Sequence, residues 1–150
     1  MAIARGAGTE IIRSALFEGY ADGPARPLII GVQHHVYTVL SVTFFCVARA
    51  ATTHYGNFRL LGFDAFGGAT GQVINIARID LDANETFVWN DKFSFNGAEP
   101  TGVSTILSTV AEQDAIADQG TTTSQHLTFD TDHAGTNFDI TVTYIDQNNA

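Results

Sequence analysis

The sequence predicts a single all-β domain, an antiparallel β-sandwich of the jelly-roll kind with an N-terminal arm. Its apolar residues alternate with polar ones or stand in short blocks, as strands require, and little of it has helical periodicity. Gly, Thr, Asn and Asp are plentiful and cluster into turn signals. A length of 150 residues with 45% hydrophobic composition suits one domain with a substantial core.

Eight or nine short strands are expected, separated by the turn sequences ADGPARP, FGGATG, FNGAEPTG and DTDHAGTN. Strands at this spacing indicate a sandwich or jelly roll rather than an alternation of strands and helices. The candidate strands are 9–18, 27–32, 35–48, 57–65, 72–79, 86–95, 103–110, 124–129 and 138–145.

The last of these strands has the cleanest alternation. One of its faces is apolar and belongs in the core, whereas the residues between are polar and face water. The core residues predicted from this strand are Phe138, Ile140, Val142 and Tyr144.

The segment DANETFVWNDKFSF (82–95) also alternates, with an aspartate, Asp91, in the middle of its aromatic face. A tight hairpin at Asn90–Asp91 would put the aromatic pairs on opposite faces, whereas one strand with a bend or bulge keeps them together on the core side. We expect a corner strand that passes from one sheet to the other, with Asp91 at the bend and not in catalysis. The aromatic core residues are Phe87, Trp89, Phe93 and Phe95.

The first residues of the chain look less integrated than the rest. The opening MAIARGAG is rich in small residues, and ADGPARP resembles a linker. Residues 1–26 are therefore predicted to form an arm or a peripheral strand, which in other proteins commonly reaches a neighbouring subunit, and residues 27–150 to form the sandwich.

Negative charge is concentrated in the C-terminal part. Residues 1–60 carry five arginines against three carboxylates, whereas residues 61–150 carry two cations against thirteen carboxylates, giving a net charge of −9. This balance argues against nucleic acid as a partner of that surface. The N-terminal arginines suit an acidic neighbour; an acidic surface that maintains solubility is an equally good and compatible interpretation.

No targeting pattern stands out. The N-terminus lacks the long apolar core and cleavage site of a signal peptide, and no run approaches the roughly 20 apolar residues of a membrane helix. We therefore expect a soluble protein made in the cytosol, without a membrane partner.

The sequence contains no catalytic or cofactor-binding signature: it lacks a GxSxG elbow, and FGGATG has no Walker lysine. Cys46 lies in the apolar run VTFFCVA and is interpreted as a small core residue. His34 and His35 are adjacent and point to opposite faces, so they do not form a chelating pair on a regular strand. No cofactor or metal site is predicted, although an oligomer could gather one histidine per subunit at its axis. The remaining histidines are His54, His126 and His133.

The segment DTDHAGTNFD (130–139) is faintly similar to a calcium loop but lacks the third ligand and the closing glutamate. We interpret it as a turn whose aspartates, Asp130 and Asp132, cap backbone groups. The sequon at Asn84 has no meaning without secretion.

Three segments resemble small β-sandwich virion proteins of tailed bacteriophages: the strand GVQHHVYTVLSVTFFCVA, the stretch ANETFVWNDKFSF and the final strand NFDITVTYID. The opening MAIARGAGTEIIR is similar to N-termini of such proteins in aquatic phages. The three segments lie within residues 30–49, 83–95 and 137–146, under a third of the chain. The sequence departs from that group after Phe95, where NGAEPTG replaces the usual Gly-Asp.

The resemblance implies a non-enzymatic structural protein of the virion, made in the host cytoplasm. A capsid decoration (cement) protein bound to the major capsid protein lattice is the first expectation, and a neck, tail or vertex-spike component the second. Homo-oligomers and contacts through the arm are expected, by apolar packing, strand addition and charge complementarity. The residues expected to contact a partner are Arg5, Glu10, Ile11, Ile12, Arg13 and Arg26.

Two alternatives remain open. A carbohydrate-binding module would share the jelly roll and use exposed aromatic rings, for which Trp89, Tyr55 and Tyr20 are the candidates. An enzyme would need a cluster of perturbed polar residues, which the sequence does not announce.

Overall fold

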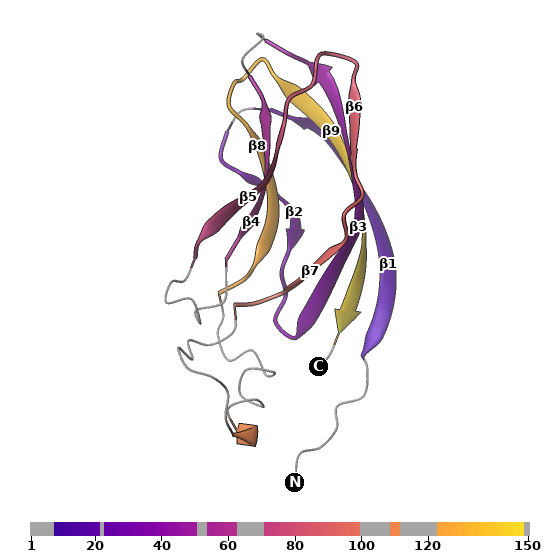
Figure 1. Ribbon diagram of the computed structural model, residues 1–150, viewed down its shortest axis with the longest axis vertical. Helices are drawn as coiled ribbons and strands as arrows, with labels where there is room; N and C mark the ends of the chain where they lie inside the picture. The colour runs from indigo at the N-terminus through magenta and orange to yellow at the C-terminus, as the bar shows by residue number, and fades with distance from the viewer. Residues whose placement is uncertain are drawn as a thin grey trace.

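The computed structural model describes residues 8–21, 23–50, 54–62, 71–99, 109–111 and 123–148. Within these ranges the chain forms two antiparallel sheets packed against each other (Figure 1), which confirms the predicted all-β sandwich. Most of the strand predicted at 103–110 lies outside the described residues. The strands are β1 (Thr9–Tyr20), β2 (Arg26–Ile30), β3 (His35–Ala48), β4 (Gly56–Leu61), β5 (Val73–Ile79), β6 (Thr86–Trp89), β7 (Phe93–Asn96), β8 (His126–Thr131) and β9 (Asn137–Asn148).

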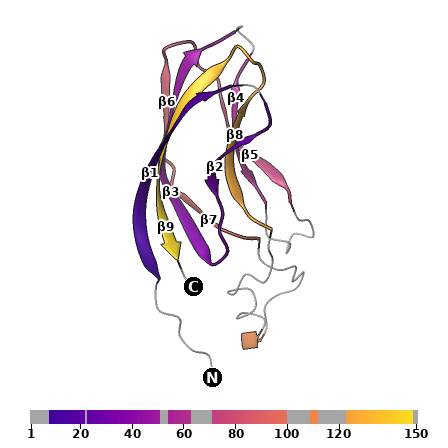
Figure 2. The same cartoon turned by 180° about the vertical axis from the view of Figure 1, so that it is seen from behind.

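The strand order is that of a jelly roll. The first sheet has the order β1-β9-β3-β6, with β7 also paired to β3, and the second has the order β2-β8-β4-β5. Strands that follow one another in sequence mostly alternate between the two sheets, so that neighbours within a sheet are distant in sequence. Strands β1 and β2 are edge strands, one in each sheet. Figure 2, seen from behind, shows both of them towards the viewer.

The core lies between the sheets and is dominated by phenylalanines. The ring of Phe44 in β3 lies 5.3 Å from that of Phe58 in β4 and 5.4 Å from that of Phe129 in β8. Each of these rings is fully buried, and burying one contributes about 2–3 kcal/mol to folding. Cys46 is also fully buried, at the end of the same inner row of β3, and burial raises the pKa of its thiol.

The predicted bend in the aromatic segment is present. Both β6 and β7 pair with β3, with Trp89 opposite Val42 and Phe93 opposite Val39. The three residues between Trp89 and Phe93 therefore lie opposite only two residues of β3, as in a bulge. The indole Nε1 of Trp89 donates to the carbonyl oxygen of Asp91 at 2.8 Å and fixes the bend. Asp91 thus contributes its backbone to the bend, with its side chain exposed.

The passage between sheets occurs later than predicted. Because β6 and β7 both belong to the first sheet, the segment does not cross at Asn90–Asp91. The chain crosses after β7, where the N–H of Gln125 donates to the carbonyl of Gly97 at 3.1 Å, just before β8. A Cβ atom on Gly97 would lie 1.8 Å from the carbonyl oxygen of Val32, so only glycine permits this approach of two backbones.

The four aromatic residues of this segment are not equally buried. Phe95 is 6% exposed and stacks on Tyr37, and Trp89 and Phe93 pack against Phe58. Phe87, expected in the core, is instead 40% exposed. It faces the interior opposite Phe44, but β6 and β5 are edge strands, and Phe87 lines an open cavity of about 240 Å³ between them.

In the last strand, three of the predicted core residues are fully buried and Tyr144 packs at the margin of the core. The inner face continues one residue further than expected. Asp146 follows Tyr144 in the same phase of the alternation and is only 8% exposed.

Candidate interaction surface

Among the described residues, the outer face of the first sheet carries no charged residue in its three central rows. Residues in register across the sheet form three rows, and their neighbours along each strand point into the core, so alternation places these side chains outside. We call this surface the uncharged face. Its rows are Leu16–Thr141–Thr43–Val88, Ser14–Thr143–Ser41 and Ile12–Ile145–Thr38–Ser94.

Hydroxyl groups on the uncharged face bond to one another across strands. The hydroxyls of Ser14 and Thr143 lie 3.2 Å apart, and those of Thr38 and Ser94 lie 2.8 Å apart. The aliphatic side chains beside them are left in solvent: Ile12 is 70% exposed and Leu16 is 61% exposed. Such a surface loses little hydration energy when it is covered, because it holds no ion.

Among the described residues, acidic residues lie at the two ends of this surface, and the exposed bend that holds Asp91 and Lys92 lies at its β6–β7 edge. Glu10, paired with Gln147, follows the row that contains Ile12. At the other end, the carboxylate of Asp139 accepts a hydrogen bond from the N–H of Gly19 at 2.9 Å. The surface therefore has an uncharged centre with acidic residues at both ends.

Strand β1 forms the free edge of this sheet and carries four of the residues predicted to bind a partner. It pairs with β9 in unbroken register from Thr9 to Phe17, and no strand pairs with its other flank among the described residues. Glu10 and Ile12 lie on the outer side, whereas Ile11 and Arg13 lie on the inner side.

The inner side of β1 borders a cavity of about 410 Å³ between the edges of the two sheets. At its wall, Asp146 accepts from Arg13 Nε at 3.0 Å and lies 2.6 Å from His35 Nδ1. Because both of its oxygens are engaged, this carboxylate links β1, β9 and β3 rather than serving as a free base. Burial raises the pKa of the neighbouring Tyr144 phenol.

The sequence contained one signal for this ion pair that our interpretation missed. Asp146 continues the apolar phase of the last strand, and a carboxylate in that phase indicates a buried charge with a partner. Its partners could not be read from the sequence, because His35 lies 111 residues away.

Of the other two residues predicted to contact a partner, Arg26 contacts a tyrosine ring within the protein. Arg26 lies over the ring of Tyr20, 5.3 Å from its centroid, and the Tyr20 hydroxyl donates to the carbonyl of Pro27 at 3.0 Å. These contacts join the end of β1 to the start of β2. Arg5 lies outside the described residues.

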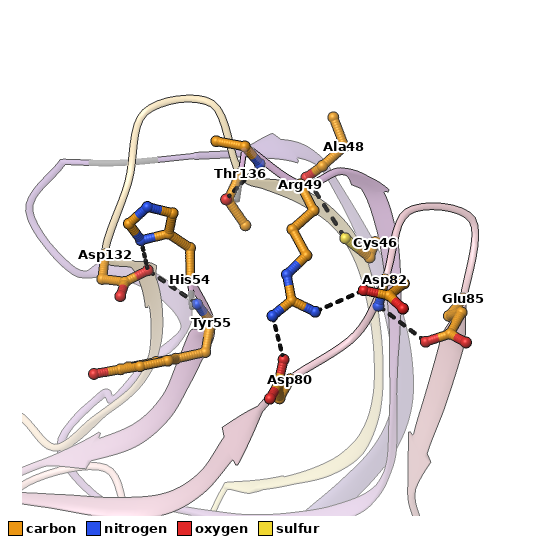
Figure 3. Close-up of polar contacts among 11 residues, drawn as sticks. Cys46, Ala48, Arg49, His54, Tyr55, Asp80, Asp82, Glu85, Asp132 and Thr136 are labelled. Carbon is orange, nitrogen blue, oxygen red and sulfur yellow. Dashed lines mark hydrogen bonds and ion pairs between the residues drawn. The ribbon is translucent and has the colours of Figure 1, made fainter. Parts of the chain in front are cut away.

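A second polar cluster occupies the opposite end of the sandwich (Figure 3). The guanidinium of Arg49, just after β3, lies between two carboxylates, at 2.8 Å from Asp80 and 2.8 Å from Asp82. The carboxylate of Glu85 accepts from the N–H of Asp82 at 2.9 Å. This cluster fastens the β5–β6 connection to the end of β3.

The segment that is faintly similar to a calcium loop forms a turn in which the aspartates diverge. Asp130 pairs with Arg59 at 2.8 Å on the outside of the second sheet. Asp132 accepts from the N–H of Tyr55 at 3.0 Å (Figure 3). Burial would raise the pKa of Asp132, but this hydrogen bond and the neighbouring His54 hold it below its ordinary value.

The histidines lie at opposite ends of the molecule. His35 begins β3 and His54 follows its far end, and a strand of 14 residues spans roughly 45 Å. The rings of His54 and His133 stack at 4.3 Å between centroids. In the part of the chain that the structure describes, no group of three or more His, Cys, Asp or Glu residues is placed to hold a metal ion.

The candidate sugar-binding rings do not form a platform. Trp89 packs edge-on against Phe58, Tyr20 lies beneath Arg26, and Tyr55 is covered by Arg78, whose guanidinium is 3.8 Å from the ring centroid. Each ring is engaged within the protein.

The fold and this surface define a class of protein: a jelly-roll sandwich with one uncharged sheet face and a free edge strand beside it. Comparison with protein-family models, with curated proteins and with solved structures finds no match for the chain. No helix among the described residues is long and apolar enough to cross a membrane.

Proposed function

We propose that this chain is a non-enzymatic structural protein of a bacteriophage particle, a capsid decoration (cement) protein that binds the major capsid protein lattice. The observation that carries the proposal is the uncharged face. Jelly rolls build viral capsid domains, and also lectins and cupins, so the fold supports this role by analogy alone.

The chemistry of the uncharged face suits adhesion. Cores of protein interfaces are depleted of charge and surrounded by a polar rim, and here the uncharged rows are bordered by Glu10 and Asp139. The acidic residues at the two ends favour a partner that offers basic residues on either side of a flat, aliphatic centre. The attachment should therefore weaken as salt is added.

The size of the surface indicates a contact repeated many times. With strands about 4.8 Å apart and about 3.3 Å per residue, the three rows cover roughly 20 Å by 20 Å including side chains. This is about half of the roughly 800 Å² that each partner contributes to a stable interface. Copies that are linked in an oligomer would gain strength through multivalency on a lattice of repeated sites, as a decoration protein would.

The test begins with the genes beside the coding sequence. If a major capsid protein is encoded there, the two proteins are produced together and the shells are sedimented. We expect the wild-type chain to travel with the shells and Thr141→Lys, which places a cation in the centre of the uncharged face, to stay in solution. Val73→Lys is the matched control, because Val73 is 54% exposed on the second sheet.

Three results would contradict the proposal: neighbouring genes unrelated to particles, shells that never carry the chain, or equal loss of binding in both variants. If the chain were found on particles at the neck, tail or vertices and not over the lattice, it would be the neck, tail or vertex-spike component of the second expectation.

A further inference from the structure

The free edge of β1 carries few of the features that usually prevent edge strands from pairing. Long exposed edges with apolar side chains template pairing with another chain, and monomers blunt them with charged side chains (lysine above all), proline or bulges. Between Thr9 and Phe17, β1 has no lysine, proline or glycine, and its register shift comes only after Phe17. The one cation in this stretch, Arg13, is paired with Asp146 at 3.0 Å.

The exposed side chains of β1 are arranged symmetrically. On the outer side, Ile12 and Leu16 flank Ser14 at equal separations in the sequence. In an antiparallel pair, residues directly opposite each other point to the same face. A two-fold axis through Ser14 would therefore place Ile12 of one copy against the partner's Leu16, and the reverse.

We propose that two copies of this chain associate edge to edge through β1, antiparallel and centred on Ser14. A symmetric contact uses the same patch on both subunits, so the patch must complement itself, as this pattern does. The pairing sets side by side two of the most exposed large apolar side chains among the described residues, Ile12 at 70% and Leu16 at 61%. A second copy is thus the occupant that the strand fits.

The net charge of the chain opposes this contact, but the centre of β1 adds nothing to that repulsion. Two copies that each carry −9 repel one another, and the centre of β1 offers no unpaired anion. At its two ends the pairing sets Glu10 opposite the partner's Glu18. Salt screens that repulsion, so the dimer should strengthen with added salt, opposite to the attachment proposed above.

The dimer would also double the area of the uncharged face proposed for attachment to the lattice. This part of the inference rests on the proposed function. Joining two β1 edges makes one continuous sheet whose two uncharged faces lie side by side. Their combined extent is roughly the 800 Å² expected of one partner in a stable interface.

The test uses the purified full-length chain and single cysteine variants. Opposite residues in an antiparallel pair have Cα atoms about 4.5–5.5 Å apart, within the range that a disulfide spans. We expect Ser14→Cys to form a covalent dimer under mild oxidation, and Thr143→Cys, one strand further inside the same sheet, to remain uncrosslinked. Native Cys46 does not interfere because it is fully buried.

The register is tested by mixing. Ile12→Cys alone and Leu16→Cys alone should give no crosslinked dimer, whereas an equal mixture should give one. Leu16→Glu should weaken association about a hundredfold in sedimentation, since the substitution occurs twice in a symmetric contact. Circular dichroism checks that this variant keeps its sheets.

A single-chain mass across a dilution series of the wild type would overturn the proposal. So would a dimer that Ser14→Cys does not crosslink, or one in which Ile12→Cys crosslinks alone, because the copies would then meet through another surface or register. A dimer from a chain that never sediments with shells would contradict only the proposed function, and shell binding by a monomer only the pairing.

Discussion

The two sheets share one core, but their outer faces differ in chemistry. The first sheet exposes methyl and hydroxyl groups, with no charge in its three central rows. On the second, Arg59 reaches both Asp130 and Asn75 at 2.8 Å, and Arg78 covers Tyr55. The second face therefore pairs charged side chains within its own sheet, whereas the central rows of the first hold no charge to pair. The core constrains only inward residues, so each outer face is free to take its own role.

We expect the largest effect on stability at Gly97, where the chain crosses from the first sheet to the second. Gly97→Ala places a Cβ atom 1.8 Å from a backbone oxygen, so the backbone itself must move. We expect a loss of about 3 kcal/mol or more in the free energy of unfolding, measured by urea denaturation. Gly71→Asn is the control, because its φ of +63° suits asparagine and open space surrounds it. Similar stabilities for the two variants would contradict this account of Gly97.

Removal of Arg59 should destabilise the second sheet. Arg59→Ala leaves Asp130, whose side chain is only 15% exposed, without its cation. We expect the free energy of unfolding to fall by about 2 kcal/mol, and by about 0.5–1 kcal/mol for Arg78→Ala, which loses an exposed contact with a ring. Association should be unchanged in both. Loss of dimer or shell binding in Arg59→Ala would show that the faces are not independent.

The second sheet should also make stability depend on pH. Burial lowers the pKa of His126, so the unfolded chain binds a proton near pH 6.5 while the folded imidazole stays neutral. Stability is therefore complete above that pH and falls as the pH drops below it. The Tm of the wild type should decline by a few degrees between pH 7.5 and pH 5.5, and that of His126→Leu by less. Asp132, whose pKa is lowered, acts in a separate window, because its contribution is lost only below about pH 4.

The smallest effect is expected on the uncharged face. Ser14→Ala removes an exposed hydroxyl contact of 3.2 Å and should change the free energy of unfolding by less than about 0.5 kcal/mol. Leu16→Ala should be equally mild for folding, because that side chain is 61% exposed, but it should weaken association. A large loss of stability in either variant would mean that this face serves folding and not binding.

The alternation of apolar and polar residues predicted the features that depend on local sequence. It identified the sandwich, the inner face of β9 and the bend that Trp89 closes on Asp91. It could not predict the strand order, which places β1, β9 and β3 side by side and so creates the uncharged face. For the same reason the exposed position of Phe87 at a sheet edge was missed.

The bend at Trp89 has a practical consequence. Trp89 is the only tryptophan of the chain, its ring packs on Phe58 between the sheets, and its indole nitrogen is bound at 2.8 Å. Intrinsic fluorescence excited at this ring therefore reports whether the two sheets remain packed together. Because β1 lies at the far edge of the first sheet from β6, the same signal should stay constant when copies associate.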